Sequence, residues 1–140
     1  MLNVRLEGLK EINDSSIQFK NNARLSKKIL RKIAETLETR LRERTARGID
    51  AKGKPFKPYS AAHAKKRLKE GKTFTVDLQF TGAMLRGLKS STNEDKGEVV
   101  LHFPDPGEAE KASFHNEQGA GKGKVIRRFF ELNKDDLDAV

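Results

Sequence analysis

The longest regular pattern along the chain is an apolar stripe that runs from about Asn22 to Arg47. Its apolar positions recur three and four residues apart, with Lys, Arg and Glu between them: Leu25, Ile29, Leu30, Ile33, Ala34, Leu37 and Leu41. This spacing places the apolar side chains on one face of a helix. Gly48 follows, where a glycine commonly ends a helix. We therefore predict one long N-terminal helix whose apolar face covers a core.

Shorter patterns predict strands. Residues 2–6 alternate apolar and polar side chains, which is the period of a half-buried strand, although they could equally form the first turn of a helix. Residues 89–92 and 98–103 flank a turn-forming sequence and therefore predict an antiparallel hairpin. Residues 73–76 are β-branched and aromatic and predict an extended segment, and residues 125–132 predict a last strand.

Helix-capping residues predict several short helices. Ser60 can cap a basic helix over 61–70, and Asp105, which is followed by proline, can begin another. Thr81 can cap a helical turn, and Asn133 can cap a closing turn at the C-terminus. The expected fold class is α+β, with the long N-terminal helix and the short helices packed on a small antiparallel sheet.

The composition indicates a single domain with a small apolar interior. The chain has 140 residues, and 35% of them are hydrophobic, against about 45% in average domains. A small interior suggests that neighbouring molecules contribute to stability. We expect one domain over residues 1–140, with flexible loops near 48–58 and 117–125 through which identical copies could reach each other.

The absence of cysteine and tryptophan removes several classes of protein. A disulfide scaffold, a zinc-finger cluster and a thiol nucleophile all need cysteine. The N-terminus lacks the apolar run of a signal peptide, and no segment approaches the roughly 20 apolar residues of a membrane span. We therefore expect a protein that is neither exported nor held in a membrane.

Charge is distributed unevenly along the chain. The formal net charge is +9, and the segment from Lys20 to Lys72 holds 18 Lys and Arg against five Asp and Glu. That segment carries +13, which leaves −4 for the rest of the chain. This asymmetry favours a polyanionic partner, or a stack of subunits in which a basic face meets an acidic one. A solvated, lysine-rich helix surface explains the same pattern equally well.

No motif for catalysis, metal binding or cofactor binding stands out. Residues 48–54 have the spacing of a phosphate-binding loop, but Pro55 replaces the Ser or Thr that binds magnesium. The histidines at 63, 102 and 115 lack metal-ligand spacing. Nucleophile elbows and paired carboxylates are also missing from the sequence. We therefore interpret the protein as a non-enzyme that uses no cofactor or metal.

Several short motifs follow one another in a particular order between Thr45 and Leu137. They are Gly53-Lys54-Pro55-Phe56-Lys57-Pro58, Thr81-Gly82-Ala83-Met84-Leu85-Arg86, Ala112-Ser113-Phe114-His115 with Gly119, and Arg128-Phe129-Phe130 leading to Asp135-Asp136-Leu137. This order resembles the virion-morphogenesis family of tailed bacteriophages, whose members are small tail-completion or neck proteins between capsid and tail. The chain departs from the family at Phe56, where tryptophan is frequent, and at 119–124, where relatives commonly have proline before arginine.

The resemblance implies a structural virion protein that forms a homomeric ring in the neck or at the top of the tail, completes the tail and joins it to the head. Its partners would be copies of itself and neighbouring neck, connector, tail-tube or terminator proteins, in a particle assembled in the cytoplasm of a host bacterium. The residues expected at subunit contacts are Lys54, Arg86, His115, Asn116, Arg127 and Arg128. The residues expected in the family core are Phe56, Leu85, Phe103, Phe114 and Phe130.

The basic segment leaves a second function open, that of a small nucleic-acid-binding or DNA-packaging accessory protein. Its lysines and arginines could follow a phosphate backbone and bind it without sequence specificity. Only 6% of the residues are aromatic, and no known nucleic-acid-binding motif is present, which argues against specific recognition. In a ring, the same charges could contact DNA that passes through the lumen.

Overall fold

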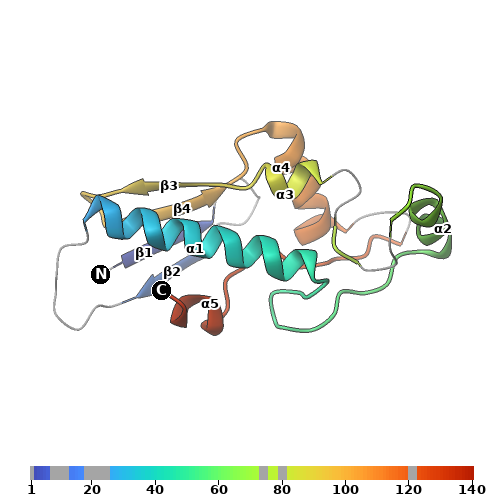
Figure 1. Cartoon of the computed structure of the whole chain (residues 1–140), viewed down its shortest axis with the longest axis horizontal. Coiled ribbons are helices and arrows are strands. Elements are labelled where there is room, and N and C mark those ends of the chain that lie inside the picture. The colour runs from blue at the N-terminus through green and yellow to red at the C-terminus, as the bar shows by residue number, and fades with distance from the viewer. Residues whose placement is uncertain (1, 7–12, 18–25, 73–75, 79–81, 120–122) are drawn as a thin grey trace.

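The computed structural model describes residues 2–6, 13–17, 26–72, 76–78, 82–119 and 123–140. The elements in chain order are β1 (Leu2–Leu6), β2 (Asn13–Ile17), α1 (Lys27–Ala46), α2 (Ala61–Lys69), α3 (Ala83–Arg86), β3 (Lys89–Asn93), β4 (Glu98–His102), α4 (Pro106–Ser113), the π-helical turn η1 (Phe114–Gln118) and α5 (Lys134–Asp138). In Figure 1, α1 lies along the sheet, and α2 lies at one end of the molecule's longest axis. The predicted α+β class is confirmed.

The sheet is mixed, with the strand order β2-β1-β4-β3. The pairs β1/β2 and β3/β4 are antiparallel, and the second pair is the predicted hairpin. At the centre β1 runs parallel to β4, with Val4 opposite Val99 and Leu6 opposite Leu101. The prediction of an antiparallel sheet is therefore wrong at this pairing. Strand β2 was not predicted, because its polar sequence lacks apolar alternation.

Helix α1 buries the stripe that its sequence predicts. The side-chain oxygen of Ser26 caps the helix by accepting a hydrogen bond from the backbone N–H of Ile29 at 3.3 Å. Leu30, Ile33, Ala34, Leu37 and Leu41 are all buried. Ile29, which the sequence places in the stripe, is 48% exposed, so the prediction is wrong at this residue. Gly48, with φ of 78°, follows the end of the helix in the left-handed region that favours glycine. Residues 22–25 of the predicted helix lie outside the described residues.

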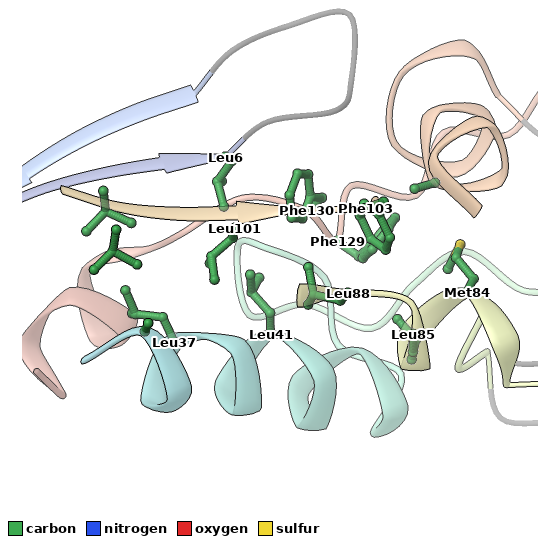
Figure 2. Close-up of a cluster of buried hydrophobic side chains, with 14 of the residues drawn as sticks. Leu6, Leu37, Leu41, Met84, Leu85, Leu88, Leu101, Phe103, Phe129 and Phe130 are labelled. Carbon is green, nitrogen blue, oxygen red and sulfur yellow. The ribbon is translucent and has the colours of Figure 1, made fainter. Parts of the chain in front are cut away.

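The core lies between α1 and the sheet and continues into a group of three phenylalanines (Figure 2). Leu6 and Leu101 reach toward α1 from the strands, and Leu37 and Leu41 rise from the helix to meet them. Phe103 packs on Phe129 and Phe130, with ring centroids 6.3 and 5.1 Å apart. Such tilted and edge contacts are favourable for aromatic rings.

Four of the five predicted core residues are buried and one is not. Phe56, Leu85, Phe103 and Phe130 belong to the hydrophobic core. Phe114 is 41% exposed, so that prediction is wrong. It lies at the start of η1, where the wider helical turn directs Asn116 inward instead.

The segment 125–132 is not the strand that its sequence predicts. Apart from an isolated bridge at Val125, its described backbone bonds go to η1, to the loop 48–58 and to side chains. The N–H of Arg127 donates to the carbonyl of His115 at 2.7 Å, and the carbonyl of Arg128 accepts from the N–H of Ala51 at 2.9 Å. Because these partners come from distant parts of the chain, local sequence gave no sign of them. Residues 73–75 of the other predicted extended segment lie outside the described residues.

Three of the predicted helix caps are confirmed. Ser60, Asp105 and Asn133 each accept a hydrogen bond from the backbone N–H three residues later, at 3.3, 3.0 and 3.0 Å. Thr81 lies outside the described residues. Helix α3 begins after Gly82, whose φ is 80° and whose position provides no side-chain cap. No helix in the described part of the chain is both long and apolar enough to span a bilayer.

Candidate assembly interface

Helix α2 has the reverse of the usual amphipathic arrangement. Its one buried side chain is that of Arg67, which is 1% exposed. Leu68 is 48% exposed, and together with Ala61, Ala64 and the stem of Lys65 it lines a shallow apolar hollow on the outer surface of the helix. These positions are three and four residues apart, so they form one stripe. The stripe is an exposed apolar surface flanked by lysines.

The segment 59–72, which we call the α2 arm, is attached to the rest of the molecule by polar and aromatic contacts. Arg67 forms an ion pair with Asp77 at 3.1 Å. The hydroxyl oxygen of Tyr59 accepts a hydrogen bond from the N–H of Leu78 at 3.1 Å. The Tyr59 ring also packs edge-on against His63, with centroids 4.6 Å apart. Several of the described contacts of the arm therefore converge on Tyr59.

Arg127 fixes the base of the arm. Its side chain donates hydrogen bonds to the carbonyls of Lys57 at 2.9 Å and Pro58 at 2.7 Å. Its guanidinium lies 5.1 Å from the centroid of the Tyr59 ring, and that of Arg67 lies 5.0 Å from the same centroid. Both distances are within the range of cation–π attraction. One aromatic ring thus joins two buried cations.

A pocket of about 270 Å³ lies where the arm meets α3, α4 and η1. Tyr59, His63 and Arg67 line it from the arm, and Lys111 and His115 line it from the body. Its remaining lining includes the buried apolar side chains of Leu78 and Met84. The pocket therefore combines apolar walls with four nitrogen-bearing side chains, those of His63, Arg67, Lys111 and His115.

The electrostatic environment of this pocket disfavours further positive charge. Burial lowers the pKa of His115 to about 4, and the charge of Arg127 acts in the same direction. Burial, followed by the charge of Arg67, also lowers the pKa of His63. Burial raises the pKa of Tyr59 and outweighs the opposing hydrogen bond from Leu78. The histidines are therefore neutral and the tyrosine is protonated at neutral pH.

The six predicted contact residues occupy different environments. Lys54, Arg86 and Arg128 are exposed, so their side chains can meet a neighbour. His115 lines the pocket. Asn116 and Arg127 are 3% and 6% exposed. The side chains of Asn116 and Arg127 therefore lie inside the molecule.

Asn116 positions the segment that carries the phenylalanine pair. Its side-chain oxygen accepts hydrogen bonds from the N–H groups of Phe129 and Phe130, each at 3.0 Å. Gly119 closes the same region with φ of 88°, and a Cβ there would lie 2.2 Å from the carbonyl oxygen of Lys124. Only glycine fits at such a contact. Both residues therefore fix the backbone of this region from within the chain.

The loop 48–58, which presents Lys54, is organised by hydrogen bonds within itself. The carboxylate of Asp50 accepts from the N–H groups of Lys52 and Lys54, each at 2.9 Å. Ile49 and Pro55 form an isolated antiparallel bridge. The flexibility of this loop stays a prediction, as does that of 117–125, of which 120–122 lie outside the described residues.

A buried ionic group that the sequence did not predict lies under α1. Asp136 bonds to the guanidinium groups of both Arg44 and Arg40, the second at 3.1 Å. Arg44 also donates to the carbonyls of Phe129 at 3.0 Å and Glu131 at 2.6 Å. The sequence does contain an indication that Arg44 is buried, because Arg44 follows Leu41 by three residues and therefore lies on the same face of the helix as the apolar stripe. The burial of Arg67 had no such indication.

Within the described residues, no three His, Asp or Glu side chains are arranged to hold a metal ion. Comparisons with protein-family models, with curated proteins and with solved structures find no match to this chain. The geometry and the order of the sequence motifs are therefore the observations that bear on function.

Proposed function

We propose that this protein is a structural virion protein of a tailed phage, which forms a homomeric ring in the neck or at the top of the tail and joins tail to head. The exposed apolar stripe on α2 is the observation that carries the proposal. Exposed apolar surface rimmed by polar residues is typical of protein contact sites. The ordered motifs between Thr45 and Leu137 support the virion context.

The placement of α2 also supports a ring. The arm occupies one end of the longest axis of the molecule, and the β3–β4 turn occupies the other (Figure 1). A contact between one end and a different surface of the next copy is heterologous, and it closes a ring when the rotation per subunit permits. The small apolar core fits a protein that gains stability from its neighbours.

The decisive experiment measures the mass of the purified protein in solution and tests the stripe. We expect a discrete multimer, or a monomer that multimerises only on a tail tube. Leu68→Glu should reduce assembly, because a charge at the contact would have to be desolvated. Ile29→Glu is the matched control, since Ile29 and Leu68 are equally exposed at 48%.

Two results would overturn this proposal. One is a protein that stays monomeric at every concentration, also with tail tubes, and is absent from purified particles. The other is equal assembly by the wild type and Leu68→Glu, which would remove α2 from the contact. Stoichiometric presence in particles, seen by mass spectrometry, supports the virion context independently of the α2 variants.

The exposed lysines of α2 favour a second candidate, a small basic nucleic-acid-binding or packaging accessory protein. Lys65, Lys66 and Lys69 are exposed on one short helix. Such a protein should retard DNA at low salt, and its affinity should fall steeply as salt rises. Lys65→Gln combined with Lys69→Gln should lessen that salt dependence. Salt-independent assembly without DNA binding would favour the ring.

A further inference from the structure

Two separate surfaces of the molecule expose large apolar side chains. One is the hollow on α2, where Leu68 stands beside three alanines and the stem of Lys65. Because alanine side chains are short, the helix surface is low there and leaves room for a bulky group. The other surface is Phe114 at the start of η1, which is 41% exposed. Phe114 does not line the α2 hollow, so the two surfaces do not cover each other within one copy.

The charges beside the hollow indicate what kind of surface can cover it. Lys65 lines the hollow, and Lys69 lies one helical turn further along α2. Both are exposed, and neither belongs to an ion pair among the described residues. A partner surface with acidic side chains around an apolar group therefore complements the hollow, because unlike charges attract across an interface and like charges repel.

The surface around Phe114 has this character. Glu110 precedes Phe114 by four residues, so the two side chains lie on the same face of the helix. Glu110 is exposed and belongs to no ion pair in the described part of the chain. Glu117 follows Phe114 within η1. The nearby Lys111 is already paired with Glu108 at 3.2 Å. The charges beside Phe114 are therefore predominantly acidic.

Two other large apolar side chains are exposed in the described part of the chain, those of Ile29 and Ile126. Ile29 has Lys28 beside it and Lys32 one turn later, and these lysines would repel those of α2. Ile126 lies in a hollow whose charges balance, with two acidic and two basic side chains: Asp50, Glu131, Lys52 and Arg128. Charge complementarity therefore favours Phe114 over both isoleucines.

We propose that Phe114 of one copy inserts into the α2 hollow of a second copy, with Glu110 next to Lys65. Aromatic side chains that fill apolar pockets often dominate the binding energy of an interface. In Figure 1, α2 lies at one end of the longest axis and α4 lies nearer the middle. The two surfaces differ, so the contact is heterologous and can repeat from copy to copy. This inference rests on the proposed ring, since it names the surface that receives α2.

Cross-linking tests the contact directly. The chain contains no cysteine, so introduced cysteines are the only thiols. Lys65→Cys protein is mixed with Glu110→Cys protein and treated with a short thiol cross-linker, which leaves Leu68 and Phe114 in place. We expect linked dimers that contain one chain of each variant, identified by mass spectrometry. The control pairs Lys65→Cys with Lys52→Cys, which lies beside Ile126 and should not link.

Removing the aromatic ring tests its contribution to the contact. Phe114→Ala should weaken self-association at least about tenfold, the usual loss for an anchor residue of an interface. Ile126→Ala is the matched control, because Ile126 is 42% exposed, and it should associate as the wild type does. Sedimentation over a range of protein concentrations, with tail tubes if the ring forms only there, measures both variants.

Reversing the charges provides a second reading that does not alter an apolar side chain. Lys65→Glu or Glu110→Lys alone should weaken self-association about fivefold, as expected for one exposed ion pair. The two changes in the same chain should restore most of the affinity, because the pair is then present with its charges exchanged. Both side chains are exposed, so the fold should not change.

Several outcomes would overturn this contact and leave the ring intact. They are a multimer in which Lys65→Cys links to Lys52→Cys but not to Glu110→Cys, assembly of Phe114→Ala equal to that of the wild type, and additive weakening by the two charge reversals. A protein that stays monomeric under every condition would overturn both the ring and the contact. The two proposals can therefore be told apart.

Discussion

The body of the molecule and its α2 arm are held together by different kinds of contact. The body buries a continuous apolar cluster between α1, the sheet and the C-terminal segment (Figure 2). Among the described residues, none of that cluster comes from the arm, 59–72. The described contacts of the arm include the Tyr59 ring between two arginines and the hydrogen bond from Leu78 to the Tyr59 hydroxyl. The body is therefore stabilised mainly by buried apolar surface, whereas the described contacts of the arm include hydrogen bonds and cation–π contacts.

This difference implies different local stabilities. Apolar burial contributes about 25 cal/mol per Å², so a large shared core unfolds as one unit. A hydrogen bond or a cation–π contact contributes only about 1 kcal/mol net. We therefore expect the arm to open without unfolding the body. A segment of low local stability that exposes an apolar stripe is well suited to becoming ordered on a partner.

The largest expected effect comes from truncating the aromatic core of the body. Phe129→Ala should lower the free energy of unfolding by about 3–5 kcal/mol, because Phe129 is 1% exposed and its removal leaves a cavity. Urea denaturation measures the loss. The exposed Ile126 provides the control, since Ile126→Ala should change stability by less than about 0.5 kcal/mol. Equal effects would show that the described core is not the source of stability.

Mutating the buried ionic group under α1 should lower the free energy of unfolding nearly as much as Phe129→Ala does. Asp136→Asn leaves Arg44 buried without a carboxylate partner, which should cost about 3 kcal/mol in thermal or urea unfolding. The control is Asp138→Asn on the same helix. Asp138 is exposed and pairs with Lys134 on the surface, so this change should cost at most about 1 kcal/mol. A stable Asp136→Asn protein would contradict the buried network.

Acidification should destabilise the protein through His115. The folded-state pKa of His115 is about 4, below its ordinary value of about 6.5, so the unfolded state binds this proton first. The associated stability is present above about pH 6.5, falls as the pH drops toward 4, and amounts to about 3 kcal/mol. Unfolding measured from pH 7 to 4 tests this. His115→Gln should show a shallower pH dependence, and an unchanged slope would contradict the assignment.

A mutation in the arm should produce the smallest change in the free energy of global unfolding. Tyr59→Leu removes the cation–π contacts and the hydroxyl that accepts from Leu78. Global unfolding should change by about 1 kcal/mol or less, whereas amide exchange in α2 should accelerate about tenfold. Hydrogen exchange with mass spectrometry resolves the two regions. Faster exchange in α1 as well would show that arm and body unfold together.

Parts of the fold that depend on neighbouring residues could be predicted from the sequence. The α1 stripe, the β3–β4 hairpin and the caps at Ser60, Asp105 and Asn133 all follow from spacing within a few residues. Helical and strand periods and cap hydrogen bonds are local properties. The exposed positions of Lys54, Arg86 and Arg128 agree with their charged side chains.

The candidate site could not be predicted in the same way. Arg67 looks like one more surface cation among lysines, and Leu68 beside it looks like the core residue of α2, yet their positions are reversed. Asn116 and Arg127 look like contact residues, yet they bond to backbone groups 13 to 70 residues away in the chain. Hydrogen bonds between such distant residues produce no periodic pattern in the sequence.

The sequence by itself therefore determined α1 and its apolar face, the β3–β4 hairpin and the capped starts of α2, α4 and α5, because these depend on side chains a few positions apart. The tertiary structure decided that β1 pairs parallel with β4, that 125–132 bonds to η1 and to the loop 48–58, and that Tyr59 is packed against two arginines. These outcomes depend on how distant segments satisfy buried polar groups together, and that requirement is met only once the chain has folded.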